Sequence, residues 1–405
     1  MKKITQITLL VLSCLLLHTA CAREGNIEEV LSESSAESSP EDSSDAAPAP
    51  ILTDDGYIYF GKTCQGTGIS YPKDGLIYSY PITGGSAEII CTDPSCLHRP
   101  FDTVSNPDPS CSAAVRGEFS DFNTLTTVNY KGSRILFETE GETIYPSNET
   151  STFIMHTRIY KADPDGRNRR LLSEIDGGIS SFEGMIQGDR LFCSLLAKIE
   201  FENVSVEIID GKKATESKST SYYYMAEIDL NDGSIHIYDD SLDTDGQWLN
   251  YLYDGEYVYA YGKKSYYRID PSKKTCEAFD EIDHLVAAKD GLIYYEPELN
   301  SLAVYDVKEQ SSHEIVCLSD CRVASFYVVD NTIIAEYQKE QDSPYNVFFF
   351  DIDGNLIKSI TTKKGIPDTL KYTCGYVISP MYGFTLPLNQ ITNICEKYDT
   401  MVLTN

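Results

Sequence analysis

The chain has 405 residues and a formal net charge of −29, with 62 acidic against 33 basic side chains. This excess of negative charge argues against nucleic acid as a partner and against direct adhesion of the protein surface to anionic lipids. Hydrophobic residues make up 41% of the sequence, which excludes a wholly disordered chain and is enough for a large core.

The first 20 residues have the features of an export signal. Lys2 and Lys3 give a basic start, and the apolar run from Ile7 to Leu17 is too short to span a bilayer as a mature helix. The run ends in Leu-His-Thr-Ala-Cys, and small residues before a cysteine resemble the lipobox of bacterial lipoproteins. This resemblance implies cleavage before Cys21 and attachment of lipid to its sulfur. The alternative is an ordinary secretory signal followed by a chance cysteine.

Residues 21–50 are rich in Ser, Glu, Ala and Pro and nearly free of aliphatic side chains. Such a segment cannot bury enough apolar surface to fold, so the composition predicts a disordered acidic tether. We therefore expect three parts, which are a signal peptide at 1–20, the tether at 21–50 and a folded domain at 51–405. The lipid on Cys21 would hold that domain at the extracytoplasmic side of a bacterial cell membrane.

A short strand motif recurs through the folded domain. Each copy has a glycine or turn dipeptide followed by β-branched and aromatic residues, as expected for a hairpin that enters a strand. The copies lie at 54–60, 131–137, 187–193, 254–260, 290–295, 330–335 and 374–379. The most regular unit, Lys289–Cys317, predicts strands at Leu292–Tyr295, Leu302–Tyr305 and Glu314–Cys317.

The spacing of the copies predicts the architecture. The last units begin roughly 36 to 43 residues apart, which suits one four-stranded propeller blade. Earlier spacings are longer and indicate insertions at 91–120, 141–152 and 199–220. Long amphipathic helical patterns are almost absent from 51–405. We therefore expect an all-β fold, a β-propeller of about seven four-stranded blades, with six or eight as alternatives.

One stretch carries residue types that bind metals. Cys91, Cys96 and His98 lie in Cys-Thr-Asp-Pro-Ser-Cys-Leu-His, directly after a strand of the first unit, and Cys111 follows within the insertion. Three thiolates and an imidazole suit a tetrahedral zinc or iron site. The alternatives are free thiols or a disulfide such as Cys96–Cys111, with His98 at the surface, because exported proteins are commonly oxidised.

The same stretch resembles a Cys-x-x-Pro-x-Cys-x-His…Cys motif. It is found in uncharacterised lipid-anchored β-propeller proteins of anaerobic, mostly Gram-positive bacteria. The matching positions are Cys91, Pro94, Cys96, His98 and Cys111. The signal, the tether and the repeats are also similar, so the resemblance covers most of the chain. It implies a propeller on a membrane anchor and no established activity.

A second cysteine pair follows the unit at Lys289–Cys317. Cys317 and Cys321 stand after a strand ending, as Cys91 does in the first unit. A turn of this length can bring two cysteines within bridging distance, so this pair is a candidate disulfide.

No sequence motif nominates a catalytic site. Gly-x-Ser-x-Gly, His-Glu-x-x-His and P-loop patterns are absent, and the histidines after the signal are scattered one per unit. We expect a monomeric, non-enzymatic module that binds a protein or a glycan through insert loops. The alternatives are a glycan lyase or hydrolase that uses the propeller channel, and a metal-linked or redox role at the Cys/His stretch.

Overall fold

The structure is a computed structural model that describes most residues between 55 and 387. The description leaves out residues 1–54, 60–61, 66–67, 82–86, 117–123, 146–149, 209–211, 240–248, 263–265, 280–281, 283, 299, 319–322, 330, 339–344, 363–370, 374–375, 380–383 and 388–405. The chain divides into two compact units, and all described residues belong to the unit at 50–399. The predicted signal peptide, Cys21 and the tether therefore lie outside the described residues.

Strands are the regular elements of the described residues, and they number 28. The prediction of an all-β fold is thus confirmed. Within the described ranges, no helix reaches the length and apolar character needed to cross a membrane.

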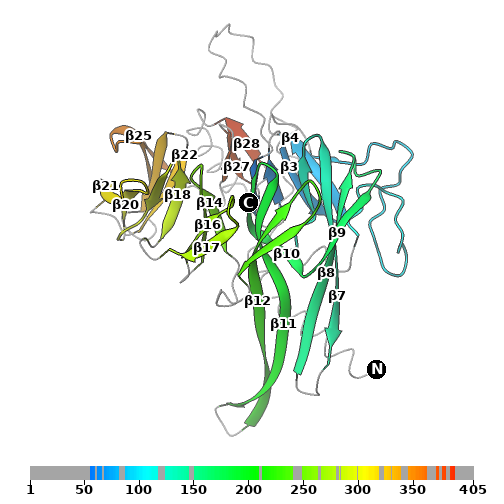
Figure 1. The fold of residues 1–405 in the computed structure, drawn as a ribbon. Helices are drawn as coiled ribbons and strands as arrows, with labels where there is room; N and C mark the ends of the chain where they lie inside the picture. The colour runs from blue at the N-terminus through cyan, green and yellow to red at the C-terminus, as the bar shows by residue number, and fades with distance from the viewer. Residues whose placement is uncertain are drawn as a thin grey trace. The chain divides into compact units, whose positions relative to one another are not determined.

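Antiparallel meanders, in which consecutive strands pair with each other, repeat along the chain (Figure 1). The first meander consists of β2 (Lys62–Gln65), β3 (Gly68–Lys73), β4 (Leu76–Pro81) and β5 (Glu88–Ile89). The second consists of β6 (Thr127–Tyr130), β7 (Ser133–Ile144), β8 (Thr150–Ala162) and β9 (Arg170–Asp176). The third consists of β10 (Gly178–Gln187), β11 (Arg190–Ile208), β12 (Lys212–Asp229) and β13 (Ile235–Asp239).

Four further sheets follow in chain order, and each is one meander. The fourth meander consists of β14 (Asn250–Tyr253), β15 (Val258–Tyr261), β16 (Tyr266–Asp270) and β17 (Thr275–Ala278), and the fifth of β18 (Leu285–Lys289), β19 (Leu292–Tyr295), β20 (Ser301–Asp306) and β21 (Ser311–Cys317). The sixth consists of β22 (Val323–Val329), β23 (Thr332–Gln338), β24 (Tyr345–Asp351) and β25 (Leu356–Thr362). The last consists of β26 (Lys371–Thr373), β27 (Tyr376–Ser379) and β28 (Phe384–Pro387).

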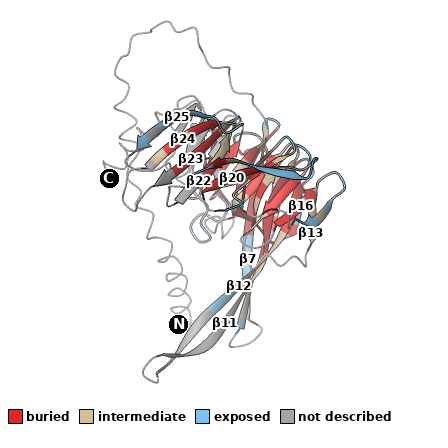
Figure 2. Ribbon diagram, turned by 90° about the vertical axis from the view of Figure 1, so that its left-hand side faces the viewer, coloured by how far each residue is buried: buried red, intermediate tan, exposed pale blue. Residues whose placement is uncertain are grey.

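Consecutive meanders pack on each other as the blades of a propeller do. Their first strands lie next to one another in series, because β10 contacts β14, β14 contacts β18, and β18 contacts β22. Apolar side chains fill the space between meanders; for example, Phe192 of β11 and Val258 of β15 belong to one buried cluster. Figure 2 shows the buried residues concentrated in the meanders. This strand order confirms the β-propeller architecture that the repeats predict.

The hairpin turns explain why the sequence repeat is recognisable. In the Asp290-Gly291 turn, both central residues have positive φ, at 51° and 78°. This is the backbone of a type I′ turn, which suits the twist of the flanking strands and favours Asp-Gly. The turn joins β18 to β19, so the blade begins one strand before the unit seen in the sequence. The three predicted strands of that unit correspond to β19, β20 and β21.

One strand joins two meanders into a single sheet. β1 (Gly56–Tyr59) pairs with β2 on one side and with β10 on the other, with Ile58 opposite Gly184. A Cβ atom at Gly184 would lie 3.0 Å from Cδ1 of Ile58, and Ile58 is fully buried. The first and third meanders therefore share a continuous hydrogen-bonded ladder through β1.

The predicted insertions at 141–152 and 199–220 are for the most part extensions of strands rather than loops. They lengthen the β7–β8 and β11–β12 hairpins, and β8 pairs with β11 from Thr150–Glu202 to Ile154–Lys198. We call residues 141–144, 150–154, 198–208 and 212–222 the arm (Figure 1). No side chain described in the arm is buried, in contrast to the meanders (Figure 2).

Candidate functional site

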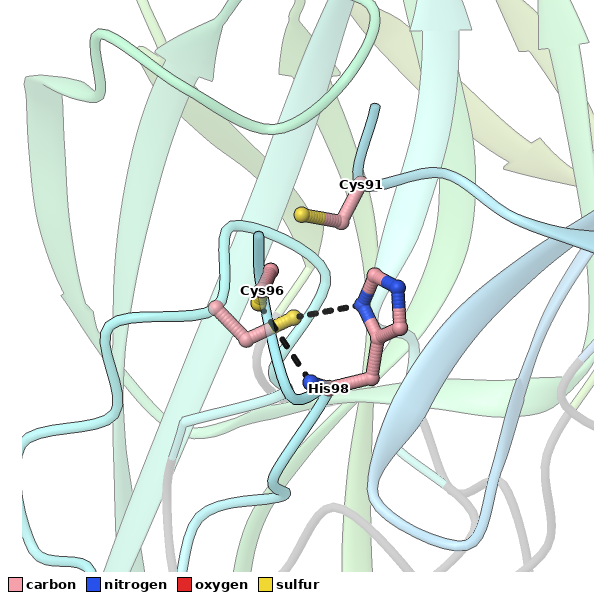
Figure 3. A group of neighbouring side chains, drawn as sticks. Cys91, Cys96 and His98 are labelled. Atoms are coloured by element: carbon pink, nitrogen blue, oxygen red, sulfur yellow. Dashed lines mark hydrogen bonds between the residues drawn. The ribbon is translucent and has the colours of Figure 1, made fainter. Parts of the chain in front are cut away.

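The four metal-ligating residue types of the first insertion converge in the structure. Cys91 follows β5, Cys96 and His98 lie in the loop after it, and Cys111 follows 13 residues beyond His98. The three sulfurs and one imidazole nitrogen all lie within 4.8 Å of one another. Figure 3 shows Cys91, Cys96 and His98 directed at a common point. The structure therefore brings together all four residues that the sequence nominates.

A hydrogen-bonded turn sets the spacing of the first two cysteines. The carboxylate of Asp93 accepts hydrogen bonds from the backbone N–H of Ser95 at 2.8 Å and from its hydroxyl at 2.7 Å. The N–H of Cys96 donates to the carbonyl of Asp93 at 3.1 Å, which closes a turn with Pro94 at its second position. Proline fixes the φ angle that this position of the turn requires, so the turn between Cys91 and Cys96 is favoured by the sequence itself.

His98 adopts a left-handed backbone conformation that residues other than glycine adopt only occasionally. Its φ angle is 48°. In this conformation the His98 N–H donates to Sγ of Cys96 at 3.4 Å, and Nδ1 lies 3.7 Å from Sγ of Cys111 (Figure 3). The left-handed conformation thus brings both the backbone and the ring of His98 against cysteine sulfurs.

The surroundings of the cysteines differ in their effect on thiolate formation. Burial opposes ionisation of Cys91, but hydrogen bonds from the Ser112 side chain and from the Asp93 and Ser112 amides outweigh it and lower its pKa to about 7. Burial is the main cause that raises the pKa of Cys111 to about 12. The cluster thus contains one thiol that ionises readily and one that needs a positive charge nearby to do so.

The end of the insertion lies between the first and second meanders. On one side, the N–H of Ile77 donates to the carbonyl of Ala113 at 2.8 Å, and the N–H of Val115 donates to the carbonyl of Gly75 at 3.0 Å. On the other side, the Ser112 hydroxyl donates to the carbonyl of Asp165 at 2.5 Å. Residues 111–116 therefore bridge two meanders directly after the last cysteine of the cluster.

An arginine of the second meander holds this bridge in place. The guanidinium of Arg169 donates to the carbonyls of Ser112 at 2.8 Å and Ala114 at 3.1 Å. It also pairs with the carboxylate of Glu138, and both side chains are largely buried. Sequence analysis missed Ser112, Arg169 and Glu138, because only the fold brings the second meander against the insertion. The run Arg167 to Arg170 in an acidic chain was a weak signal.

The second candidate pair is described only in part. Cys317 ends β21 and is exposed, whereas Cys321 lies outside the described residues. Cys193, near the start of β11, is a fully buried free thiol.

The histidines outside the cluster occupy separate places. His156 lies on β8 and pairs with Asp176 at 2.9 Å, whereas His236 lies on β13 and packs edge-on against Tyr238. His284 precedes β18 and His313 lies on β21.

A pocket of about 210 Å³ is formed by residues of the fourth meander, among them Tyr257, Arg268 and Lys273. Its cations are already paired, Arg268 with Glu277 and Lys273 with Asp270. Its volume is below the roughly 300–1,000 Å³ of typical ligand sites.

The arm presents two chemically different faces. Side chains opposite each other in the register share a face, and neighbours along a strand alternate. Phe153 pairs with Ile199, and Phe201 pairs with Ser151, so these side chains lie together. We call the part of this side that lies nearest the meanders the neutral face; its members are Gly141, Thr143, Ser151, Phe153, Ile199, Phe201, Ser219 and Ser221.

The opposite side, the charged face, carries Glu142, Lys198, Glu200, Glu202 and Lys218 together with Ile144, Ile154 and Tyr222. There Glu200 accepts hydrogen bonds from Lys198 and from the Tyr222 hydroxyl, each at 2.7 Å.

No protein-family model matches the chain, and no curated protein matches it. Solved structures with a similar fold include dipeptidyl peptidase 4 of Porphyromonas gingivalis, at 11% identity and a TM-score of 0.39, covering 81% of this chain and 56% of that one. They also include TolB of Acinetobacter baumannii, at 9% identity and a TM-score of 0.31, covering 77% and 64%. BamB of Moraxella catarrhalis is similar at 10% identity and a TM-score of 0.33, covering 83% and 98%.

The chain thus spans less than two thirds of the length of the first two of these proteins. The likeness concerns the fold alone, and the assignment of this chain to the β-propeller architecture rests on its strand order.

Proposed function

We propose that the chain is a lipid-anchored, extracytoplasmic β-propeller that acts as a non-enzymatic binding module and contacts a partner protein through the neutral face of its arm. The observation that carries this proposal is the register of the arm, which places Phe153, Ile199 and Phe201 together on a stretch of the neutral face, from Gly141 to Ser221, that carries no charge. In a chain of net charge −29, an uncharged apolar strip on the arm, where no described side chain is buried, is a recognisable contact surface.

The chemistry of this face favours a protein over a glycan. Two phenylalanines and an isoleucine, bordered by hydroxyl side chains, offer apolar area and few fixed hydrogen-bonding groups. Protein interfaces have such an apolar centre with a polar rim. Glycan recognition would draw more on fixed polar groups, which lie on the charged face of the arm.

Site-specific photo-crosslinking on intact cells tests the proposed surface. The neighbouring exposed positions Ser219 and Thr220 place the crosslinker on the neutral and the charged face, respectively. We expect one discrete protein adduct from Ser219 and much less of it from Thr220. The Phe201→Thr variant should lose the Ser219 adduct, whereas Glu202→Thr, on the charged face, should keep it. Equal adducts from both positions, a glycan adduct or no adduct would contradict the proposal.

The lipid anchor is supported by the apolar run of the signal, the small residues before Cys21 and the acidic tether after it. Metabolic labelling with an alkyne fatty acid tests it, with Cys14→Ser as the matched control for Cys21→Ser. We expect label and membrane association in the native chain and in Cys14→Ser, and loss of both in Cys21→Ser. Label that persists in Cys21→Ser would overturn the assignment of the anchor.

A further inference from the structure

We propose that Cys91, Cys96, His98 and Cys111 form a structural zinc site that fastens the first meander to the second. The convergence of the donor atoms is the first argument. Zn–S bonds of about 2.3 Å and Zn–N bonds of about 2.0 Å in a tetrahedron place neighbouring donor atoms about 3.5–3.8 Å apart. The 3.7 Å between Cys111 Sγ and His98 Nδ1 matches that spacing, and all four donors lie within 4.8 Å of one another.

A disulfide explains less of this arrangement. Such a bond joins two sulfurs at about 2.05 Å and makes no use of a third sulfur or an imidazole. Here the third cysteine and His98 are directed at the same point, and His98 holds a φ angle of 48° while doing so. A metal ion would use all four groups at once.

The surroundings of the sulfurs also suit a bound cation. The amide of His98 donates to Sγ of Cys96, and the Asp93 amide donates to Sγ of Cys91. Hydrogen bonds to ligand sulfurs orient them and stabilise their negative charge, as outer-shell partners of metal sites do. Three soft sulfur donors favour zinc over magnesium or calcium. Four protein donors complete a tetrahedron and leave no open position, which is the pattern of a structural site.

The position of the site in the fold gives the metal its role. Cys91 lies two residues after the end of β5 in the first meander, whereas Cys111 begins the segment that Arg169 and Asp165 of the second meander hold. A metal ion shared by Cys91 and Cys111 closes the loop between them and fixes residues 111–116 between the first and second meanders. We call this contact between the two meanders the seam. Closing such a loop removes conformational freedom from the unfolded chain, so metal binding stabilises the seam.

Elemental analysis of the full chain, purified with a reductant and without oxygen, tests the metal. We expect one equivalent of zinc, lost in Cys96→Ser and His98→Ala, kept in Cys276→Ser as a thiol-loss control, and regained in His98→Cys, which restores a fourth soft donor. Cobalt substitution should give the intense visible absorption of tetrahedral thiolate coordination. Stoichiometric iron, absence of metal, or a disulfide between any two of Cys91, Cys96 and Cys111 in freshly isolated protein would overturn the zinc site.

Hydrogen–deuterium exchange before and after chelation tests the fastening role separately. Removal of zinc should speed amide exchange by roughly tenfold or more at Ile77 and Val115, whose hydrogen bonds join the insertion to the first meander, and at Ala114, whose amide donates to the carbonyl of Cys111. Exchange in the β14–β17 meander should not change. Unchanged exchange at the seam would overturn the fastening role even if zinc is bound.

Discussion

Arg169 and Glu138 form a largely buried ion pair across the second meander, and the same guanidinium donates to the carbonyls of Ser112 and Ala114. One side chain therefore neutralises a buried carboxylate and also holds the bridge that ends the Cys/His insertion. Desolvation opposes the charge of Arg169 and lowers its pKa, and Glu138 offsets part of that effect.

We predict that Arg169→Met destabilises the protein by about 3–5 kcal/mol, because Glu138 would remain buried without its main partner. Urea unfolding measures this change. Arg158→Met is the matched control, since Arg158 pairs with Glu140 and Glu174 at the surface and should cost at most about 1 kcal/mol. The double variant Arg169→Met/Glu138→Gln should recover part of the loss. Equal losses for the two arginines would contradict a special role of the buried pair.

Gly166 should tolerate no side chain. Its φ angle is 80°, and a Cβ atom there would lie 2.3 Å from the carbonyl oxygen of Ser112. Gly188 also has a positive φ angle, of 57°, but no atom lies within 4 Å of its Cβ position. We expect Gly188→Ala to cost about 1–2 kcal/mol from backbone strain and Gly166→Ala to cost about 1–3 kcal/mol more from the clash. Thermal unfolding of the two variants side by side measures the difference. Equal costs would mean that the insertion does not press against this turn.

Acid should remove the contribution that Asp189 makes to the stability of the folded protein. Hydrogen bonds from Lys131, Tyr130 and Asn231 lower the pKa of Asp189 to about 2. The folded-state pKa lies below the unfolded value of about 3.9, so the contribution is complete above about pH 4 and is lost as the pH falls toward 2. We expect the difference in melting temperature between the native chain and Asp189→Asn to be constant above pH 4 and to shrink toward zero near pH 2. A difference that does not depend on pH over this range would contradict the assignment.

The cysteines outside the cluster should differ in their reactivity toward alkylating reagents. Cys193 is fully buried, and burial raises its pKa to about 12, so it should resist alkylation until the protein unfolds. Cys317 is exposed, and the sequence predicts a disulfide with Cys321. If that disulfide forms, peptide mass spectrometry will find both residues unmodified before reduction and alkylated after it. Alkylation of Cys317 in the unreduced native protein would show a free thiol and contradict the disulfide.

The sequence predicted those parts of the fold that depend on local chemistry. Asp-Gly turns and alternating aromatic strands are local, and the strands of Lys289–Cys317 correspond to β19, β20 and β21. The first strand of that blade, β18, was missed because Leu-Val-Ala-Ala-Lys carries no aromatic residue and follows no turn signal. The arm was predicted only as two insertions, because the pairing of β8 with β11 depends on strands that are distant in sequence.

The candidate site, like the fold, was predicted where it depends on residues close in sequence and was missed where it depends on distant ones. Cys91, Cys96 and His98 are close in sequence, so their residue types and spacing nominated them. Whether Cys111 would join them depended on the path of a long insertion, which the structure shows returning to the cluster. Arg169 and Glu138 belong to another meander, and no local pattern could connect them with the insertion.

The pairing of β1 with β10 has a consequence for the order in which the chain assembles. β1 is synthesised early, yet one of its two hydrogen-bonding partners belongs to the third meander. The first meander can form its local hairpins at once, but one edge of β1 has no partner until β10 has emerged. Contacts between distant segments form slowly because a large loop must close first. An unpaired strand edge also attracts other chains. The third meander thus completes the first, and a nascent chain stalled before β10 would be the form most prone to aggregate.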